Sequence, residues 1–317
     1  KAGLKHHVKI ISKQEFWDAL PDVMYHMDEP LGDASAVALY FLSKEAAGHV
    51  KVVLSGEGAD ELFGGYNIYR EPEALKKVAW IPFRLRRAVR KLAAKLPDVK
   101  GRDFLIRAGM KVEERFIGNA YIYREKEKAQ ILKNKVTGPS TQEYLRPFFE
   151  ELESENRESL QDMEKMQSVD LSYWLPGDIL QKADKMSMAH SLEVRVPFLD
   201  KEVFDFAAKL PKEAKIAAGT TKYIFRKAVS EFLPQETDER KKLGFPIPIR
   251  VWLRQDDWYQ MVTDLFTSKA AEEFFRTEEL LQLLKDHKNK KADNSRKIWT
   301  VLTFLIWYDR FFTTCSK

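Results

Sequence analysis

Apolar and polar residues alternate along the first part of the chain in a pattern that predicts strands and helices in turn. Short apolar runs at 8–11 and 50–54 predict strands, and periodic segments at 13–26 and 34–47 predict helices, the first with Ser12 as its N-cap. The run at 50–54 is apolar at nearly every position, as is typical of a parallel strand covered on both faces. This rhythm predicts an α/β fold with a parallel sheet flanked by helices.

The rest of the chain is dominated by helical periodicity. Residues 71–165 are charged, with apolar positions three and four apart, and predict a helical elaboration of the same domain. Residues 201–317 predict a mainly helical C-terminal part. The most apolar stretch, 298–308, contains threonines and is flanked by charges, so it is shorter than the roughly 20 residues that a bilayer requires. We expect a buried helix there and no membrane partner.

The amino-acid composition indicates a globular protein but does not by itself indicate a function. The chain has 317 residues, of which 44% are hydrophobic and 32% charged, as in a globular domain rather than a disordered one. The net charge is +5, and the basic run at 84–91 is interpreted as a solvated helix face, so no nucleic-acid partner is expected. The single cysteine, Cys315, excludes an internal disulfide and favours a reducing, cytoplasmic setting.

The loop at 55–65, Ser-Gly-Glu-Gly-Ala-Asp-Glu-Leu-Phe-Gly-Gly, follows the second predicted strand directly. Ligands of α/β proteins bind at the carboxyl ends of strands, and the glycines would expose backbone N–H groups to a phosphate. The carboxylates of Glu57, Asp60 and Glu61 would repel a polyphosphate, which implies a cation such as Mg²⁺ between them. The alternative is that these acids only cap the following helix, and the spacing leaves both readings open.

Two long segments carry a family resemblance. Residues 54–66, Leu-Ser-Gly-Glu-Gly-Ala-Asp-Glu-Leu-Phe-Gly-Gly-Tyr, and residues 187–200, Ser-Met-Ala-His-Ser-Leu-Glu-Val-Arg-Val-Pro-Phe-Leu-Asp, resemble the most distinctive motifs of the glutamine-hydrolysing asparagine synthetases. With the tryptophan-containing ending at 297–312, the resemblance spans nearly the whole chain. The chain as a whole (1–317) is therefore identified as resembling the C-terminal synthetase domain of that family, an adenylating domain of the pyrophosphatase-loop ATP superfamily with an adenine nucleotide alpha hydrolase-like fold.

The resemblance implies a reaction and its ligands. Such enzymes use ATP and Mg²⁺ to convert aspartate to β-aspartyl-AMP, which ammonia then attacks to give asparagine. The ammonia comes from glutamine in a separate glutaminase domain, and a homodimer is the assembly that the resemblance suggests. The order of steps suits elementary chemistry, because a carboxylate becomes an electrophile only after its oxygen joins a leaving group, and positioned cations stabilise the departing pyrophosphate.

The resemblance also implies roles for single residues. Ser55 and Gly56 match the pair that contacts the nucleotide, and Asp60 matches the carboxylate that holds Mg²⁺. Glu57 matches the glutamate near the reacting centre, where a carboxylate can take a proton from ammonia or orient the intermediate.

Three basic residues match positions that face substrate or phosphate in the family. These are Lys185, Arg195 and Lys222, of which Lys222 matches the lysine assigned to pyrophosphate. The alternative for each is a surface ion pair, or for Arg195 a partly buried structural salt bridge.

The sequence also departs from the family pattern. No Ser-Gly-Gly-x-Asp-Ser stretch occurs, and no N-terminal nucleophilic cysteine is present, since Cys315 lies at the other end. We therefore expect the first strand–loop–helix, about 60 to 80 residues by the size of a βαβ unit, to be missing, and this chain alone to be inactive. Two alternatives stay open: a β-lactam-forming synthetase, for which Tyr173 lies near the relevant segment, and a non-catalytic module of the same fold.

Two further groups of residues attract attention without a firm role. Asp28 and Asp33 flank the break between the first two predicted helices and are candidates for an active-site rim. His6 and His7 look like a ligand pair, but adjacent residues of a strand point to opposite faces, so one metal ion would not easily bind both.

Overall fold

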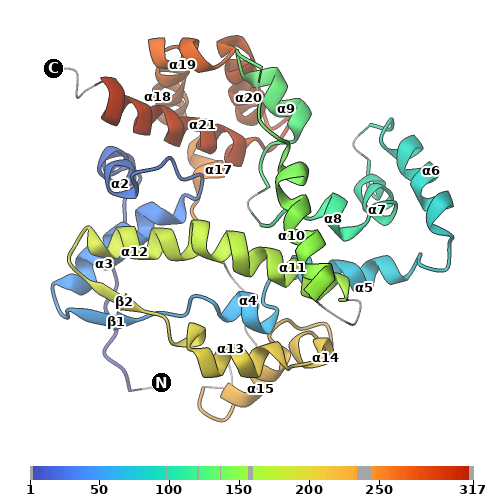
Figure 1. Ribbon diagram of the computed structural model, residues 1–317. Coiled ribbons are helices and arrows are strands. Elements are labelled where there is room, and N and C mark those ends of the chain that lie inside the picture. Colours follow the sequence, from blue (N-terminus) through green and yellow to red (C-terminus); the bar gives the residue numbers. More distant parts are fainter. Residues whose placement is uncertain are drawn as a thin grey trace.

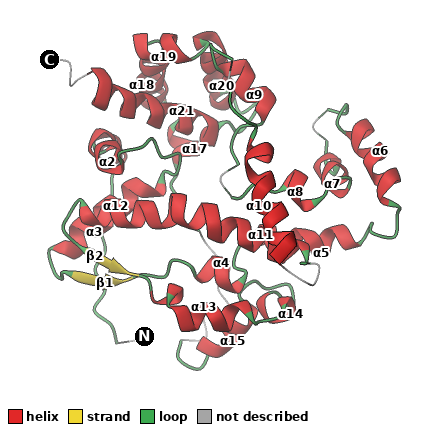
Figure 2. Ribbon diagram, in the orientation of Figure 1, coloured by secondary structure: helices red, strands yellow, loops and turns green. Residues whose placement is uncertain are grey.

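The computed structural model describes residues 3–97, 99–119, 121–135, 137–155, 160–233 and 244–313. Helices make up most of this part of the chain, and a short strand pair lies toward one side of it (Figures 1 and 2). Cys315 lies outside the described residues.

The two strands of the described chain form a parallel pair. β1 (Val52–Leu54) and β2 (Glu193–Arg195) place Val53 opposite Val194 and Leu54 opposite Arg195. Helix α12 (Gln181–Met188) packs against both β2 and α3 (Ser35–Ala47), so helices cover one side of the pair (Figure 1). Both strands end at the same edge, and the α/β class predicted from the sequence is confirmed at this coarse level.

Two sequence predictions about the strands are wrong. Residues 8–11 form no strand: Val8 is 67% and Ile10 83% exposed, and within the described residues no ladder hydrogen bond joins this segment to β1 or β2. The run at 50–54 is not covered on both faces, because Val52 and Leu54 are 42% and 72% exposed. An apolar run is buried only where neighbouring elements cover it, and β2 is the only strand beside β1 in the part of the chain that is described.

The N-terminal helices follow the predicted pattern closely. Ser12 caps α1 (Lys13–Asp18) as predicted: its Oγ accepts from the Glu15 N–H at 3.1 Å, and the Glu15 carboxylate accepts from the Ser12 N–H at 2.9 Å. The helix predicted over 13–26 is split into α1 and α2 (Leu20–Met27), because Pro21 lies in the first turn of α2 and begins a new helix.

The largest hydrophobic core joins α1 and α2 to the C-terminal helices, which lie together at the top of Figure 1. Trp258 and Phe16 are fully buried in it, and Ile298, Leu302 and Leu305 confirm the buried helix predicted at 298–308. None of the helices in the described ranges is long and apolar enough to cross a membrane. The helices of this part are α17 (Ile249–Trp252), α18 (Asp256–Phe266), α19 (Lys269–Phe274), α20 (Thr277–Lys288), α21 (Ser295–Tyr308) and the π-helix η4 (Asp309–Thr313).

The middle of the chain forms a helical lobe on the right of Figure 1. Its core is a second hydrophobic cluster around Tyr69, Phe149 and Met166. The elements are the 3₁₀-helix η1 (Asn67–Arg70), α5 (Glu71–Lys76), α6 (Phe83–Ala93), α7 (Arg102–Ala108), α8 (Val112–Arg115), α10 (Thr141–Glu155) and α11 (Asp162–Val169). Helix α9 (Glu125–Ile131) follows α8 in the chain but packs against α20 and buries Ile131 in the largest core.

A third hydrophobic cluster holds the element that follows β1. α4 (Ala59–Phe63) buries Leu62 and Phe63 against Ala207, so the start of α4 is fixed beside the carboxyl ends of the strands. The elements that surround it are the π-helix η2 (Asp170–Leu180), the 3₁₀-helix η3 (Pro197–Leu199), α13 (Lys201–Ala208), α14 (Lys212–Lys215) and α15 (Tyr223–Val229).

Candidate active site

The loop after β1 continues the parallel ladder before it turns into α4. The Ser55 N–H donates to the Arg195 carbonyl at 2.9 Å, and the Ser55 hydroxyl donates to the Glu57 carboxylate. Gly58 caps α4 with φ +87°, and a Cβ there would lie 2.3 Å from the Leu199 side chain. Only glycine combines this left-handed backbone with so close an approach, so the loop is held tightly at the strand ends.

Asp60 and Lys222 lie together although they are far apart in the sequence. Lys222 Nζ is 3.0 Å from Asp60 Oδ1, and both side chains are largely shielded from solvent. The pair lies against Gly65, where a Cβ would be 1.8 Å from Asp60 Oδ1 and 2.5 Å from Lys222 Cε. The structure thus brings together the predicted metal carboxylate and the predicted pyrophosphate lysine.

Lys222 is presented by an unusual backbone turn. It has φ +54° at the start of α15, a left-handed conformation that costs a residue with a side chain about 1 kcal/mol. Such strained positions cluster at functional sites, where the surrounding structure maintains them. The turn places the ammonium group over the start of α4.

The other two predicted basic residues lie apart from that pair. Arg195 ends β2 beside the loop, but its side chain is 64% exposed and its Nε lies 2.8 Å from Glu193 Oε1. Lys185 on α12 forms an ion pair with Asp28 at the end of α2, and the hydrogen bond that Lys185 donates to the Asp28 carboxylate raises the pKa of Lys185. The backbone carbonyl of Arg195 therefore contacts the loop, while Lys185 is held by the segment after α2.

A buried hydrogen-bond chain lies behind the loop, and the sequence reasoning missed it. Glu61 is 1% exposed, Tyr66 donates its hydroxyl to Glu61 Oε1 at 2.6 Å, and Trp174 Nε1 donates to the Tyr66 oxygen at 3.1 Å. Burial raises the pKa of Glu61. The sequence groups Glu61 with Glu57 and Asp60 as acids around a predicted cation. In the structure the Glu61 carboxylate points away from solvent, toward Tyr66.

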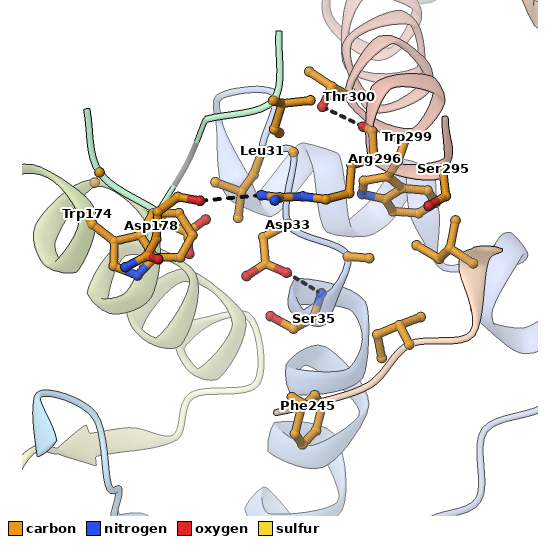
Figure 3. Close-up of a pocket in the computed structure, with 18 of the residues that line it drawn as sticks. Leu31, Asp33, Ser35, Trp174, Asp178, Phe245, Ser295, Arg296, Trp299 and Thr300 are labelled. Atoms are coloured by element: carbon orange, nitrogen blue, oxygen red, sulfur yellow. Dashed lines mark hydrogen bonds between the residues drawn. The ribbon is translucent and has the colours of Figure 1, made fainter. Parts of the chain in front are cut away.

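A cavity of about 720 Å³ lies next to this hydrogen-bond chain, since Tyr66 and Trp174 line it. Figure 3 shows the cavity. In Figure 3 the side chain of Arg296 extends from α21 across the cavity, and Asp33 lies at the start of α3. Trp174 and Tyr66 line it too, whereas the loop at 55–60 and Lys222 are not among its lining residues. The cavity and the Asp60–Lys222 pair are therefore neighbouring regions joined through Tyr66 and Glu61.

One wall of the cavity carries a buried charge cluster. Lys182 lies between the Asp33 carboxylate and Asp178 Oδ2, the latter 2.9 Å away. Burial raises the pKa of Asp178 to about 6. Burial alone would also raise the pKa of Asp33, but the ion pair with Lys182 holds it below its ordinary value. Asp33, one of the two rim candidates, does line the cavity, and Asp28 does not.

Comparisons with known proteins give the family. The family model described as asparagine synthase matches residues 1–309. Asparagine synthetase (glutamine-hydrolyzing) 1 of Bacillus subtilis strain 168 is 48% identical over 307 residues, which are 96% of this chain and 48% of that protein. A putative asparagine synthetase (glutamine-hydrolyzing) of Mycobacterium bovis is 41% identical over 310 residues, 98% of this chain and 47% of that protein. The chain spans about half the length of these curated relatives.

Proposed function

Because the chain belongs to the asparagine synthase family, we propose that it carries the ATP-using site of an enzyme that makes asparagine. A side-chain oxygen of aspartate attacks the α-phosphorus of ATP, and the bond to pyrophosphate breaks. Ammonia, supplied from glutamine by a glutaminase domain of the intact enzyme, then attacks the acyl carbon of β-aspartyl-AMP. AMP leaves, and a proton is lost from nitrogen.

The observation that carries this proposal is the Asp60–Lys222 pair at the carboxyl ends of two parallel strands. Asp60 would hold Mg²⁺, because carboxylate oxygens are the ligands that this ion prefers, and the adjacent Glu57 offers a second carboxylate. Mg²⁺, when bound, would neutralise charge on the leaving pyrophosphate. The Lys222 ammonium lies 3.0 Å from Asp60 Oδ1 and would bind the same phosphates.

The remaining roles rest on the loop geometry. Ser55 and Gly56 would contact the nucleotide, since a Cβ at Gly56 would meet no atom within 4 Å and the backbone there is accessible. Glu57 would accept a proton from attacking ammonia or orient the acyl-adenylate. Arg195 and Lys185 would exchange their present partners, Glu193 and Asp28, for substrate or phosphate oxygens.

The proposal extends to the architecture and setting of the enzyme. The parallel pair with α3 and α12 beside it fits an adenine nucleotide alpha hydrolase-like fold of the pyrophosphatase-loop superfamily. Within a single synthetase domain, 71–165 would form the helical elaboration and 201–317 the C-terminal part. A homodimer and a cytoplasmic setting belong to the same proposal.

Isotope exchange between labelled pyrophosphate and ATP, measured on the enzyme at its native length without a nitrogen source, tests the proposal. We expect exchange that requires both aspartate and Mg²⁺, and we expect Asp60→Asn to lower it by about 100-fold with little loss of stability. Exchange without aspartate but with a bulkier amino-acid substrate would favour the β-lactam-forming alternative. No exchange under any condition would favour a non-catalytic module.

Gly65→Ala should disturb the same site by displacing the side chains of Asp60 and Lys222. The new methyl group would overlap Asp60 Oδ1 and Lys222 Cε, and these flexible side-chain ends would have to separate. We expect pyrophosphate exchange to fall by at least about tenfold, because misplacement by about 1 Å can cost a hundredfold. The free energy of unfolding should change by only about 1 kcal/mol.

The matched control for this variant is Gly138→Ala, where a Cβ would meet no atom within 4 Å. It should leave both exchange and stability unchanged. Equal exchange in Gly65→Ala and Gly138→Ala would show that the position of the Asp60–Lys222 pair does not matter to the reaction.

A further inference from the structure

Two histidines and a glutamate meet on the surface near the end of α3, outside the site described above. The rings of His7 and His49 have their centroids 4.2 Å apart, and His49 Nε2 lies 3.4 Å from Glu45 Oε1. One ligand atom from each of His7, Glu45 and His49 can be chosen so that all three lie within 4.8 Å of one another. We propose that these three side chains form a zinc site that fastens the N-terminal segment to the end of α3.

Local backbone geometry places two of the ligands on one face. Glu45 lies in the last turn of α3, and His49 follows four residues later, just beyond the C-cap Gly48. The turn continues past the helix end, because the His49 N–H donates to the Ala46 carbonyl at 2.9 Å. Residues four apart on such a turn face the same side. His7 reaches this face from the segment that precedes α1.

The donor set selects the class of metal. Two imidazole nitrogens and one carboxylate oxygen are ligands typical of Zn²⁺, which leaves a fourth tetrahedral position for water. Donors around a tetrahedral zinc ion lie about 3.3 Å apart, given metal–ligand distances of about 2.0 to 2.1 Å. Glu45 and His49 already have this spacing. The ligand atom of His7 lies within 4.8 Å of the other two. The exposed His7 ring therefore has to move toward them by at most about 1.5 Å.

The assignment changes the interpretation of the two adjacent histidines in the sequence. His6 and His7 do not act as a pair: in the described part of the chain, His7 joins the ligand group and His6 does not. A bound ion would connect residues 3–11, which have no regular secondary structure, to the segment that leads from α3 into β1. The site would therefore order the N-terminal segment and would be independent of the proposed synthesis of asparagine.

Calorimetric titration of the metal-free protein with zinc chloride tests the proposal. The protein carries the substitution Cys315→Ser throughout, because a cysteine thiolate would also bind zinc. We expect one ion per chain. His7→Ala and His49→Ala should each weaken binding by at least about 30-fold, since even the loss of an outer partner of a zinc ligand costs 10- to 100-fold. Zinc should also raise the unfolding temperature of the parent protein and not that of these variants.

The matched control is His6→Ala, which removes the same side chain one residue away and should change zinc affinity less than about threefold. X-ray absorption of the zinc-loaded protein should show two imidazole ligands. Equal weakening by His6→Ala and His7→Ala, or unchanged affinity in His49→Ala, would overturn the proposed ligand set. A protein that binds zinc no more tightly than the variant lacking all three side chains would overturn the site itself.

Discussion

Lys222→Ala in the enzyme at its native length should lower kcat and kcat/KM for asparagine formation together, by about 100- to 1,000-fold. If the ammonium group neutralises the departing pyrophosphate, its interaction strengthens as charge develops, so its loss raises the barrier rather than only weakening substrate binding. The structure adds a second reason, because Lys222 Nζ lies 3.0 Å from Asp60 Oδ1, and its removal takes away a positive charge that lies beside this carboxylate.

Pyrophosphate exchange in the presence of aspartate, without ammonia, is the decisive measurement for Lys222→Ala, because it reports adenylation alone. Lys222→Arg should restore exchange only in part, since a planar guanidinium cannot place its charge at the same point. Lys227→Ala is the matched control, an exposed lysine on the same helix α15. An alanine variant of Lys222 that exchanges as fast as the Lys227 variant would remove Lys222 from the site.

The sequence predicted the order of strand, loop and helix around this site because that information is local. A strand, a glycine-containing turn and the first turn of a helix follow one another within a dozen residues at 52–63, and each has its own residue preferences. The contact between Asp60 and Lys222 is not local information of this kind. No spacing rule connects residues so far apart, and only the resemblance to a family suggested that both face the same phosphates.

The errors in the sequence analysis also have physical causes. A short apolar run at 8–11 satisfies the strand pattern, but a strand exists only if a neighbour accepts its hydrogen bonds. Among the three acids of the loop, Glu61 departs from the prediction for a related reason. Glu61 lies one residue after Asp60, yet its side chain points inward to Tyr66. Successive residues of a helix are rotated by about 100°, so neighbours such as these can lie on different faces. Whether a face is buried depends on what packs against it and not on the identity of the residue.

Buried carboxyl groups outside the motifs were also missed, and Asp170 is the clearest case. It lies at the start of η2, fully buried, and accepts hydrogen bonds from the Tyr69 hydroxyl at 2.6 Å and from Asn119 Nδ2 at 2.8 Å. Burial raises the pKa of Asp170 from its ordinary value of 3.8 to about 7, although the hydrogen bonds from the Tyr69 hydroxyl and from the Asn119 backbone N–H oppose the shift. Because no residue pattern marks such a site, only the packed structure reveals it.

Asp170→Asn should therefore change how stability depends on pH. A raised pKa means that the folded state holds the proton more tightly than the unfolded state, so the stabilisation is complete below about pH 3.8 and is lost as the pH rises to about 7. The difference of about three pH units corresponds to at most roughly 4 kcal/mol. Asparagine stays neutral, and its side-chain oxygen can accept both hydrogen bonds now made to Asp170 Oδ2.

Urea unfolding of the chain between pH 4 and pH 8 measures this difference. The free energy of unfolding of Asp170→Asn, relative to the parent chain, should rise with pH by up to about 4 kcal/mol, with most of the change between pH 4 and pH 7. Asp205→Asn, a substitution of an exposed aspartate on α13, should give a profile parallel to the parent chain. A parallel profile for Asp170→Asn as well would mean that Asp170 ionises in the folded chain as readily as in the unfolded one. Burial would then not govern its protonation, and the hydrogen bonds from Tyr69 and Asn119 would be enough to hold the charge.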